Sequence, residues 1–256
     1  MRKDRGRAGV TLIELLIAVT LVSLLSVGIL YAMRIGLITL ERTNDKLVAN
    51  RRVLGAQRIL DQQVSNLIAV KTLCNGPRDD AGNGTVPFFH GERHQMRFVS
   101  RYTIQDAARG GPQVLEYAVI QGANNRGVRL VVNEMPYTGP SSIDPLCAGT
   151  ATDPATGMVV GRYAPVQAGP RSFVIADKLT FCRLSYQVVD PRNGNKIWVE
   201  QFQGYFPPQA IRIEMAPIEP DPSRLQMTTT VVPVRVFRSS RVVYKDIDEE
   251  QDPQYQ

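Results

Sequence analysis

The stretch RAGVTLIELLIAVTLVSLLSVGILYAM, from Arg7 to Met33, decides the fold of the N-terminal part of the chain. Residues 10–33 contain no charged side chain other than Glu14. As a helix they would measure about 36 Å, which is enough to cross a hydrocarbon core of about 30 Å. A carboxylate inside a bilayer costs about 2.5–3.5 kcal/mol. We therefore predict a transmembrane helix over 10–33 in which Glu14 has a partner.

The residues before this stretch are basic, because Arg2, Lys3, Arg5 and Arg7 outweigh Asp4. A short basic flank predicts a cytoplasmic N-terminus and an external location for the rest of the chain. A secretory signal peptide would have a shorter apolar core followed by a small-x-small cleavage site, which GILYAMR (28–34) does not supply. A cleavage site is therefore better sought before the apolar run.

The basic leader, Gly9 and the following VTLIELL (10–16) together resemble the class III leader of type IV prepilins and type II secretion pseudopilins. The resemblance implies that a membrane prepilin peptidase removes residues 1–9 by cutting between Gly9 and Val10, and then methylates the new N-terminus. It also implies that Glu14 neutralises the α-ammonium of a neighbouring subunit during filament assembly. Val10 departs from the phenylalanine that is commoner in the family. The alternative reading is a plain single-pass anchor with a chance glutamate.

The helical pattern continues through residues 34–74 and becomes amphipathic. Leu40, Leu47 and Leu54 lie seven residues apart. A second stripe lies on an overlapping face and comprises Val53, Leu60, Val64, Leu67 and Ile68. The helix is expected to reach about Thr72 and to end at CNGP (74–77). We expect both stripes to pack on the core of the chain's own domain, and a coiled-coil partner is the alternative.

Residues 75–245 show the two-residue alternation of β-strands. In QMRFVSRYTI (95–104), apolar positions 96, 98, 102 and 104 alternate with polar ones, which predicts one buried face and one wet face. QVLEYAVIQ (113–121) and RGVRLVV (126–132) follow after glycine-rich turns and complete an antiparallel meander. Residues 133–170 hold six prolines and five glycines and are expected to be an irregular surface insertion. Strands resume at 178, 196, 209 and 225, before an acidic tail at 246–256.

This order predicts an α+β, pilin-like fold in which a long N-terminal helix packs on antiparallel sheet. The segment from Leu179 to Pro217 resembles the J-type minor pseudopilins of type II secretion, through Trp198, Pro208, Ala210, Ile211, Arg212 and Ile213. The resemblance implies an inner-membrane subunit with a periplasmic domain, which joins other minor and major pseudopilins at the tip of a filament that drives exoprotein export. The alternative is a minor type IV pilin that primes an external pilus for adhesion, motility or DNA uptake.

The composition and the remaining motifs favour a structural protein over an enzyme. The 256 residues are 43% hydrophobic and 21% charged, which suits one or two globular units, and the net charge of +6 is expected to be a solvated surface. The sequence has no Gly-x-Ser-x-Gly, phosphate loop or dinucleotide motif, so a periplasmic hydrolase is disfavoured. We expect no catalytic residue and no cofactor.

Three other motifs carry residue types that occur in ligand sites. HGERH (90–94) lacks the zinc-peptidase spacing, so no metal is expected there. The acidic DIDEEQD (246–252) lacks the glycine and spacing of a calcium loop. A basic strip of Arg235, Arg238, Arg241 and Lys245 is expected to be a solvated strand edge, and no nucleic acid is expected as a partner.

The three cysteines show no C-x-x-C spacing, so neither a zinc knuckle nor a thioredoxin motif is expected. Cys182 lies on the apolar face of its predicted strand and is expected to be a buried free thiol. Cys74 and Cys147 lie at the helix end and in the insertion. Because the domain should face an oxidising compartment, these two are the expected disulfide pair.

Overall fold

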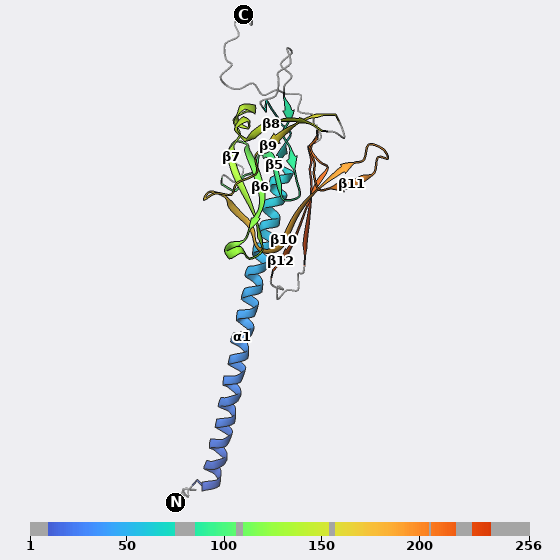
Figure 1. Ribbon diagram of the computed structural model, residues 1–256. Coiled ribbons are helices and arrows are strands. Elements are labelled where there is room, and N and C mark those ends of the chain that lie inside the picture. The colour runs from blue at the N-terminus through green and yellow to red at the C-terminus, as the bar shows by residue number, and fades with distance from the viewer. Residues whose placement is uncertain are drawn as a thin grey trace, which may run out of the picture. The chain divides into compact units, whose positions relative to one another are not determined.

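The computed structural model of the chain describes residues 10–74, 85–105, 110–153, 157–204, 206–218 and 227–236. The leader at 1–9 and the acidic tail at 246–256 therefore lie outside the described residues. The chain divides into two compact units, Met1–Arg52 and Val53–Gln256. The first unit is helical, and the second combines the end of the same helix with the β-strands (Figure 1).

A single helix, α1, runs over the 54 residues Leu12–Ser65. Its first turn closes when the backbone N–H groups of Glu14 and Leu15 donate to the carbonyl of Thr11, at 3.1 and 3.2 Å. The helix is shorter than the sequence predicted, because it ends at Ser65 and not near Thr72. Residues Leu67–Ile68 and Lys71–Thr72 instead form the short strands β1 and β2.

The early end of α1 has a tertiary cause. The Ser100 hydroxyl donates to the carbonyl of Gln63 at 2.8 Å, and the Asn66 side-chain amide donates to the carbonyl of Gln62 at 2.8 Å. The Gln63 carbonyl lies in the last turn of α1, where carbonyls lack a helical partner, so the Ser100 hydroxyl takes that place. The Gln62 carbonyl also accepts from the backbone N–H of Asn66 at 3.2 Å. Directly afterwards, β1 pairs antiparallel with the strand that carries Ser100. The apolar residues that predict a longer helix are therefore used in the sheet.

The main sheet has nine strands in the order β1-β5-β6-β7-β10-β12-β13, with β4 beside β5 and β11 beside β10, and every pairing is antiparallel. Its strands are β1 Leu67–Ile68, β4 His90–Gly91, β5 Gln95–Ser100, β6 Gln113–Gln121, β7 Val128–Pro136, β10 Phe173–Val189, β11 Lys196–Val199, β12 Ala210–Pro217 and β13 Thr228–Pro233. The predicted meander is confirmed as β5-β6-β7. The predicted α+β, pilin-like class is confirmed as well.

Two small ribbons and three short 3₁₀ helices complete the second unit. One ribbon pairs β2 Lys71–Thr72 with β3 Val86–Pro87, and the other pairs β8 Cys147–Thr152 with β9 Val159–Tyr163. The 3₁₀ helices are η1 Ala123–Asn125, η2 Pro140–Ser142 and η3 Asp144–Leu146. The strands β8 and β9, the helices η2 and η3 and the end of β7 all arise from the segment expected to be irregular.

The larger core joins the end of α1 to one face of the sheet. Leu60 and Val64 of α1 and Leu67 of β1 are buried in it, as the second stripe predicted. The first stripe behaves differently, because Leu40, Leu47 and Leu54 are 68%, 51% and 63% exposed. The expectation that these three leucines pack in the core is wrong.

The opposite face of the sheet is also covered, which corrects the expectation of a wet face on β5. In β5, every residue from Met96 to Ser100 is buried, including Arg97, which is 1% exposed. The strand also ends at Ser100, so positions 102 and 104 lie beyond it. A second apolar cluster forms on this face from Val70, Phe88, Val99, Val114 and Ile143.

Part of that cover comes from residues 133–170, which are not an irregular surface insertion. Residues 133–136 belong to β7, and the rest carries η2, η3 and the β8–β9 ribbon. Ile143 is fully buried in the second cluster, and Leu146 and Tyr163 pack against it. The segment, which we name the cap (residues 137–167), therefore contributes a hydrophobic layer to the domain.

Candidate processing and assembly site

The predicted processing junction lies at the start of α1. Gly9 lies outside the described residues, whereas Val10 is exposed and precedes the helix, which begins at Leu12. Val10 and Thr11 precede the first residue of α1, and the carbonyl of Thr11 accepts the first hydrogen bonds of the helix.

Glu14 lies in the first turn of α1, where its carboxylate is exposed. A negative side chain is favoured at this place, because the unpaired N–H groups of a helix start carry partial positive charge. None of the ion pairs among the described residues includes Glu14. The partner that its position in an apolar helix demands is thus absent from the described part of its own chain.

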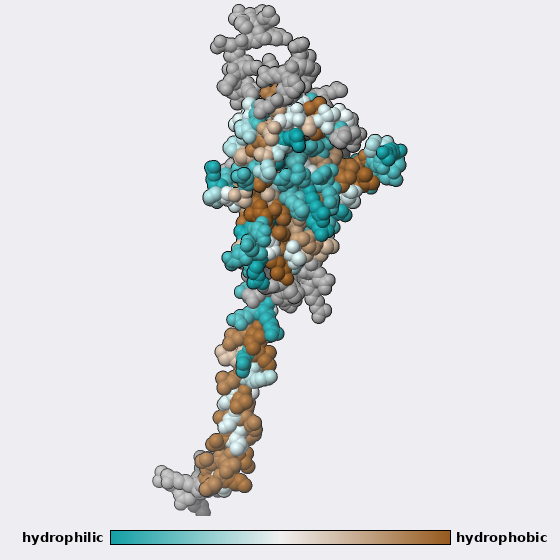
Figure 2. All heavy atoms as spheres, viewed as in Figure 1, coloured by the Kyte–Doolittle hydropathy of each residue, from teal (hydrophilic) through white to brown (hydrophobic). Residues whose placement is uncertain are grey.

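The helix around Glu14 is suited to a membrane. Leu12–Asn44 has a mean hydropathy of 2.5 over its most apolar window and is long enough to cross a bilayer. Figure 2 shows the brown, apolar surface of this helix. Five hydroxyl side chains of this helix are compatible with lipid, because each hydroxyl donates to a backbone carbonyl one turn earlier. Thr20, Ser23, Ser26, Thr39 and Thr43 all do so at 2.8 Å.

Further along α1, the leucine stripe offers an apolar surface. Leu40 and Leu47 belong to the first unit and Leu54 to the second, and all three are exposed. A seven-residue spacing places the side chains along one side of a helix. These leucines are therefore available to a second helix.

At its C-terminal end, α1 is bound to three neighbouring strands through Gln63, a residue that the sequence did not single out. The side-chain amide of Gln63 meets Tyr117 of β6 and Glu134 of β7, and its backbone carbonyl accepts from Ser100 of β5. Gln63 is fully buried. The signal in the sequence was a glutamine one position before an apolar residue of the buried stripe.

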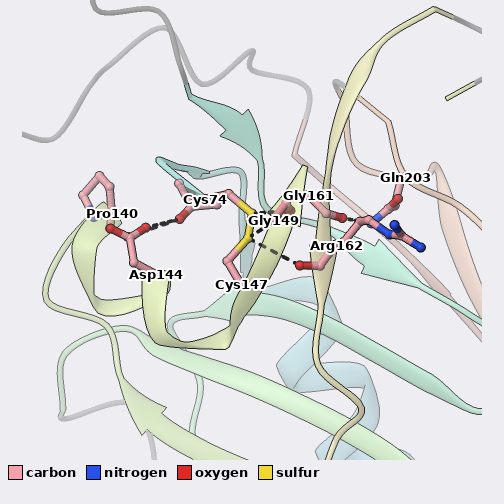
Figure 3. The surroundings of a disulfide bond; sticks show 9 residues. Cys74, Pro140, Asp144, Cys147, Gly149, Gly161, Arg162 and Gln203 are labelled. Carbon is pink, nitrogen blue, oxygen red and sulfur yellow. Dashed lines mark hydrogen bonds between the residues drawn. A yellow bond between two sulfur atoms is a disulfide. The ribbon is translucent and has the colours of Figure 1, made fainter. Parts of the chain in front are cut away.

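Cys74 and Cys147 form a disulfide whose Cα atoms lie 5.3 Å apart (Figure 3). It joins the segment that follows α1 to the start of β8 in the cap. Beside it, the Thr72 hydroxyl donates to Asp144 Oδ1 at 3.0 Å, and these residues link the same two segments. The third cysteine, Cys182, is a buried free thiol, and burial raises its pKa to about 12.

Removing this disulfide is expected to destabilise the second unit. The bond closes a loop with a sequence separation of 73 residues, and loss of a disulfide typically costs about 2–4 kcal/mol because the unfolded chain gains freedom. We predict that Cys74→Ser/Cys147→Ser lowers the free energy of unfolding by that amount in urea titrations of the full chain in detergent. Cys182→Ala serves as the control for a general loss of cysteine, because it leaves no polar group in the core. Equal stability of the wild type with and without reductant would contradict the prediction.

The cap is also held on the sheet by polar side chains. Arg97 Nε lies 2.6 Å from Glu116 Oε1 in a buried ion pair, and the Arg97 guanidinium also donates to the carbonyl of Ala164. Gln95 Oε1 accepts from the backbone N–H of Val166 at 3.2 Å. Sequence reasoning missed these contacts, because it placed Arg97 on a wet face.

The histidines of HGERH do not form a metal site within the described residues, where no group of three metal-ligand side chains occurs. His90 is buried in β4, and its Nε2 lies 3.1 Å from Glu92 Oε1. Burial lowers the pKa of His90, against the opposing effect of Glu92. In the basic strip, Arg235 is exposed, and positions 238, 241 and 245 lie outside the described residues.

The segment that resembled J-type pseudopilins forms β10, the β10–β11 hairpin and β12. Gln187 of β10 pairs with Trp198 of β11, and the turn between these strands falls at PRNGN (191–195), as predicted. The Arg212 guanidinium lies 4.5 Å from the centre of the Trp198 ring, and its Nε donates to Ser185 Oγ at 2.9 Å. The tryptophan and the arginine of the motif are therefore in contact.

Comparison with known families finds one match in the N-terminal part of the chain. Residues 4–30 match the prokaryotic N-terminal methylation motif. The matched residues include Gly9, Val10 and Glu14. A search of curated proteins finds no match to this chain. The chain thus carries the N-terminal methylation signal of type IV pilins and pseudopilins, at the head of a long apolar helix and an antiparallel sheet.

Proposed function

We propose that this chain is a minor pseudopilin of a type II protein secretion system. Prepilin peptidase cuts between Gly9 and Val10 and methylates Val10. The mature chain stays in the inner membrane through its first helix, with its N-terminus at the cytoplasmic side and the second unit in the periplasm. It assembles with other minor pseudopilins at the tip of a periplasmic filament. Major pseudopilins form the rest of that filament.

The observation that carries this proposal is the methylation motif with its unpartnered acid. Cleavage would create an α-ammonium at Val10, a few residues from the Glu14 carboxylate of the same or a neighbouring chain. Each charge is costly in lipid, and the two together are less so. The acid therefore favours packing of one subunit's helix start against that of the next subunit.

Two further features support a structural role in an assembly. The exposed stripe of Leu40, Leu47 and Leu54 gives α1 a surface on which another helix can pack. The segment that contains the Trp198 and Arg212 contact favours the J-type branch of the pseudopilins, by the resemblance noted above. No catalytic role is assigned to any residue.

The proposal predicts that Glu14→Leu inserts in the membrane and fails to assemble. The substitution removes a charge that opposes insertion and the only acid of the first turn. Tagged full-length chain is expressed with the minor pseudopilins of a type II system, and these partners are quantified after affinity purification from detergent-solubilised membranes. We expect at least a tenfold loss of each partner, equivalent to about 1.4 kcal/mol.

Glu41→Leu provides the matched control, because Glu41 is an exposed acid of the same helix, far from the processing junction. This variant is expected to retain its partners. Normal recovery of partners by Glu14→Leu would refute the pairing with the N-terminus. Recovery of the minor pilins of a type IV system, and of none of the pseudopilins, would favour an external pilus over secretion.

A further inference from the structure

Gln63 is a polar residue on the side of α1 that is otherwise buried through apolar side chains. It is fully buried between Leu60 and Val64, which belong to the larger core. A buried amide is costly unless its donor and acceptor groups are both paired. Its partners are therefore a strong constraint on where the end of the helix can lie.

The side chain of Gln63 is the middle member of a chain of hydrogen bonds in which each residue donates to the next. The Tyr117 hydroxyl donates to Gln63 Oε1, and Gln63 Nε2 donates to Glu134 Oε1 at 2.8 Å. The same carboxylate oxygen accepts from the backbone N–H of Ile104 at 2.7 Å. Burial, followed by the charge of Glu134, raises the pKa of Tyr117, so its hydroxyl stays protonated and remains a donor.

Apolar packing alone sets the position of a helix poorly, because the hydrophobic effect has no direction. A helix that slides by one residue moves by about 1.5 Å and turns by about 100°, and one full turn is about 5.4 Å. Leucine and valine side chains can repack after such a step. The amide of Gln63 cannot, because its partners on β6 and β7 hold fixed places in the sheet.

We propose that Gln63 is a positioning residue that fixes the axial and rotational setting of the last turns of α1 on the sheet. Buried polar groups in coiled coils select register in a comparable way. The consequence for assembly rests on the proposed function: the setting of α1 decides which part of the sheet each subunit presents to its neighbour.

The test measures the helix setting directly in the full chain in detergent. Spin labels at Arg58→Cys on α1 and Gln121→Cys on β6 are compared with a sheet-only pair, Gln121→Cys and Thr229→Cys. All three positions are exposed in the second unit. Cys182 is buried and Cys74 and Cys147 are bonded, so the labels attach to the new cysteines.

The main variant is Gln63→Leu/Tyr117→Phe, which removes the amide together with the hydroxyl that it would leave unpaired. Glu134 keeps the donors from the backbone of Ile104 and Gln105. We expect the helix-to-sheet distance distribution to shift by about 1.5–5.4 Å or to double in width. The sheet-only distance is expected to stay unchanged. In the control variant Gln62→Leu, which carries the same substitution one residue earlier, the helix-to-sheet distance is expected to stay unchanged as well.

A charge swap separates positioning from folding. In Gln63→Glu/Glu134→Gln, the carboxylate at position 63 can accept from Tyr117 and from the amide at position 134, whose oxygen still accepts from Ile104. This variant is expected to restore the narrow wild-type distribution. An unchanged narrow distribution in Gln63→Leu/Tyr117→Phe would overturn the proposal. If that variant is unfolded by circular dichroism, failure of the charge swap to keep the wild-type distance overturns it instead.

Assembly is then measured with the same variants and the minor pseudopilin partners. A positioning role predicts a loss of partner recovery of at least fivefold in the apolar variant, with recovery in the charge swap, at a temperature where both are folded. If wild-type chain itself recovers no pseudopilin, the proposed function fails, while the spin-label result still decides the role of Gln63.

Discussion

Gly9→Val is expected to abolish cleavage of the leader, so that the full-length chain accumulates in the membrane. A peptidase that cuts after glycine must bring its catalytic groups against the scissile carbonyl, and a branched side chain at Gly9 would occupy that space. Glycine also permits backbone conformations that branched residues do not. We expect the rate of processing to fall below about one per cent of the wild-type rate, which is a loss of more than about 2.7 kcal/mol of transition-state stabilisation.

Mass spectrometry of the chain purified after co-expression with a prepilin peptidase measures this directly. The wild type is expected to begin with a methylated Val10, and Gly9→Val with the unprocessed leader. Gly6→Val is the matched control, because it places the same side chain at the other glycine of the leader. A mature N-terminus at any other residue, or full processing of Gly9→Val, would exclude the proposed junction.

The N-terminal helix was predictable because its signal is local. A run of apolar residues as long as a bilayer, with a single acid and a basic flank, needs no information from the rest of the chain. The same holds for the strands β6, β10 and β12, whose two-residue alternation lies within each segment. The turns at 122–127 and 191–195 were equally local, since glycine and asparagine mark them.

The end of α1 was not predictable, because its cause lies 35 residues further along the chain. Ser100 supplies the hydroxyl that satisfies Gln63, and β5 supplies the pairing that converts Leu67 from helix to strand. The periodicity of the second stripe fitted both states, so the sequence favoured a longer helix. The partners of Gln63 are also far away in sequence, at Tyr117 and Glu134.

The buried second face of the sheet was missed for a similar reason. Arg97 alternates with apolar residues, and a charged residue in such a pattern normally faces water. Here the cap provides an oxygen from Ala164, while Glu116 on the adjacent strand provides the opposite charge. The cap itself lacks alternation because β8 and the turns around it are rich in glycine, threonine and proline.

The second large effect is expected at this same place, where Arg97→Met should strongly destabilise the second unit. Glu116 lies opposite Arg97 in the β5–β6 register and is nearly as buried. In Arg97→Met, the Glu116 carboxylate loses the guanidinium and keeps a weak hydrogen bond from Asn133 Nδ2 at 3.4 Å. Breaking a buried ion pair by removal of one partner typically costs about 3–5 kcal/mol, because the other charge stays buried and unpaired.

Most of that cost reflects the charge left behind and not the strength of the pair. Arg97→Met/Glu116→Leu removes both charges and fills the site with apolar side chains of similar length. Such a replacement is often neutral or stabilising. We therefore expect the double variant to regain most of the stability that Arg97→Met loses, apart from the hydrogen bond to Ala164.

Arg129→Met is the matched control, because Arg129 Nε lies 3.3 Å from Asp177 Oδ1 in an ion pair that is much more exposed. Its loss should cost less than about 1 kcal/mol, since water screens exposed pairs. Urea unfolding of the full chain in detergent measures all three variants. Limited proteolysis then tests the location of the effect: because Arg97 binds the carbonyl of Ala164, Arg97→Met should loosen the cap and speed trypsin cleavage at Arg162, an exposed residue of β9, before the rest of the sheet unfolds. Equal losses of stability for Arg97→Met and Arg129→Met would mean that the contacts of Arg97 do not hold the cap on the sheet.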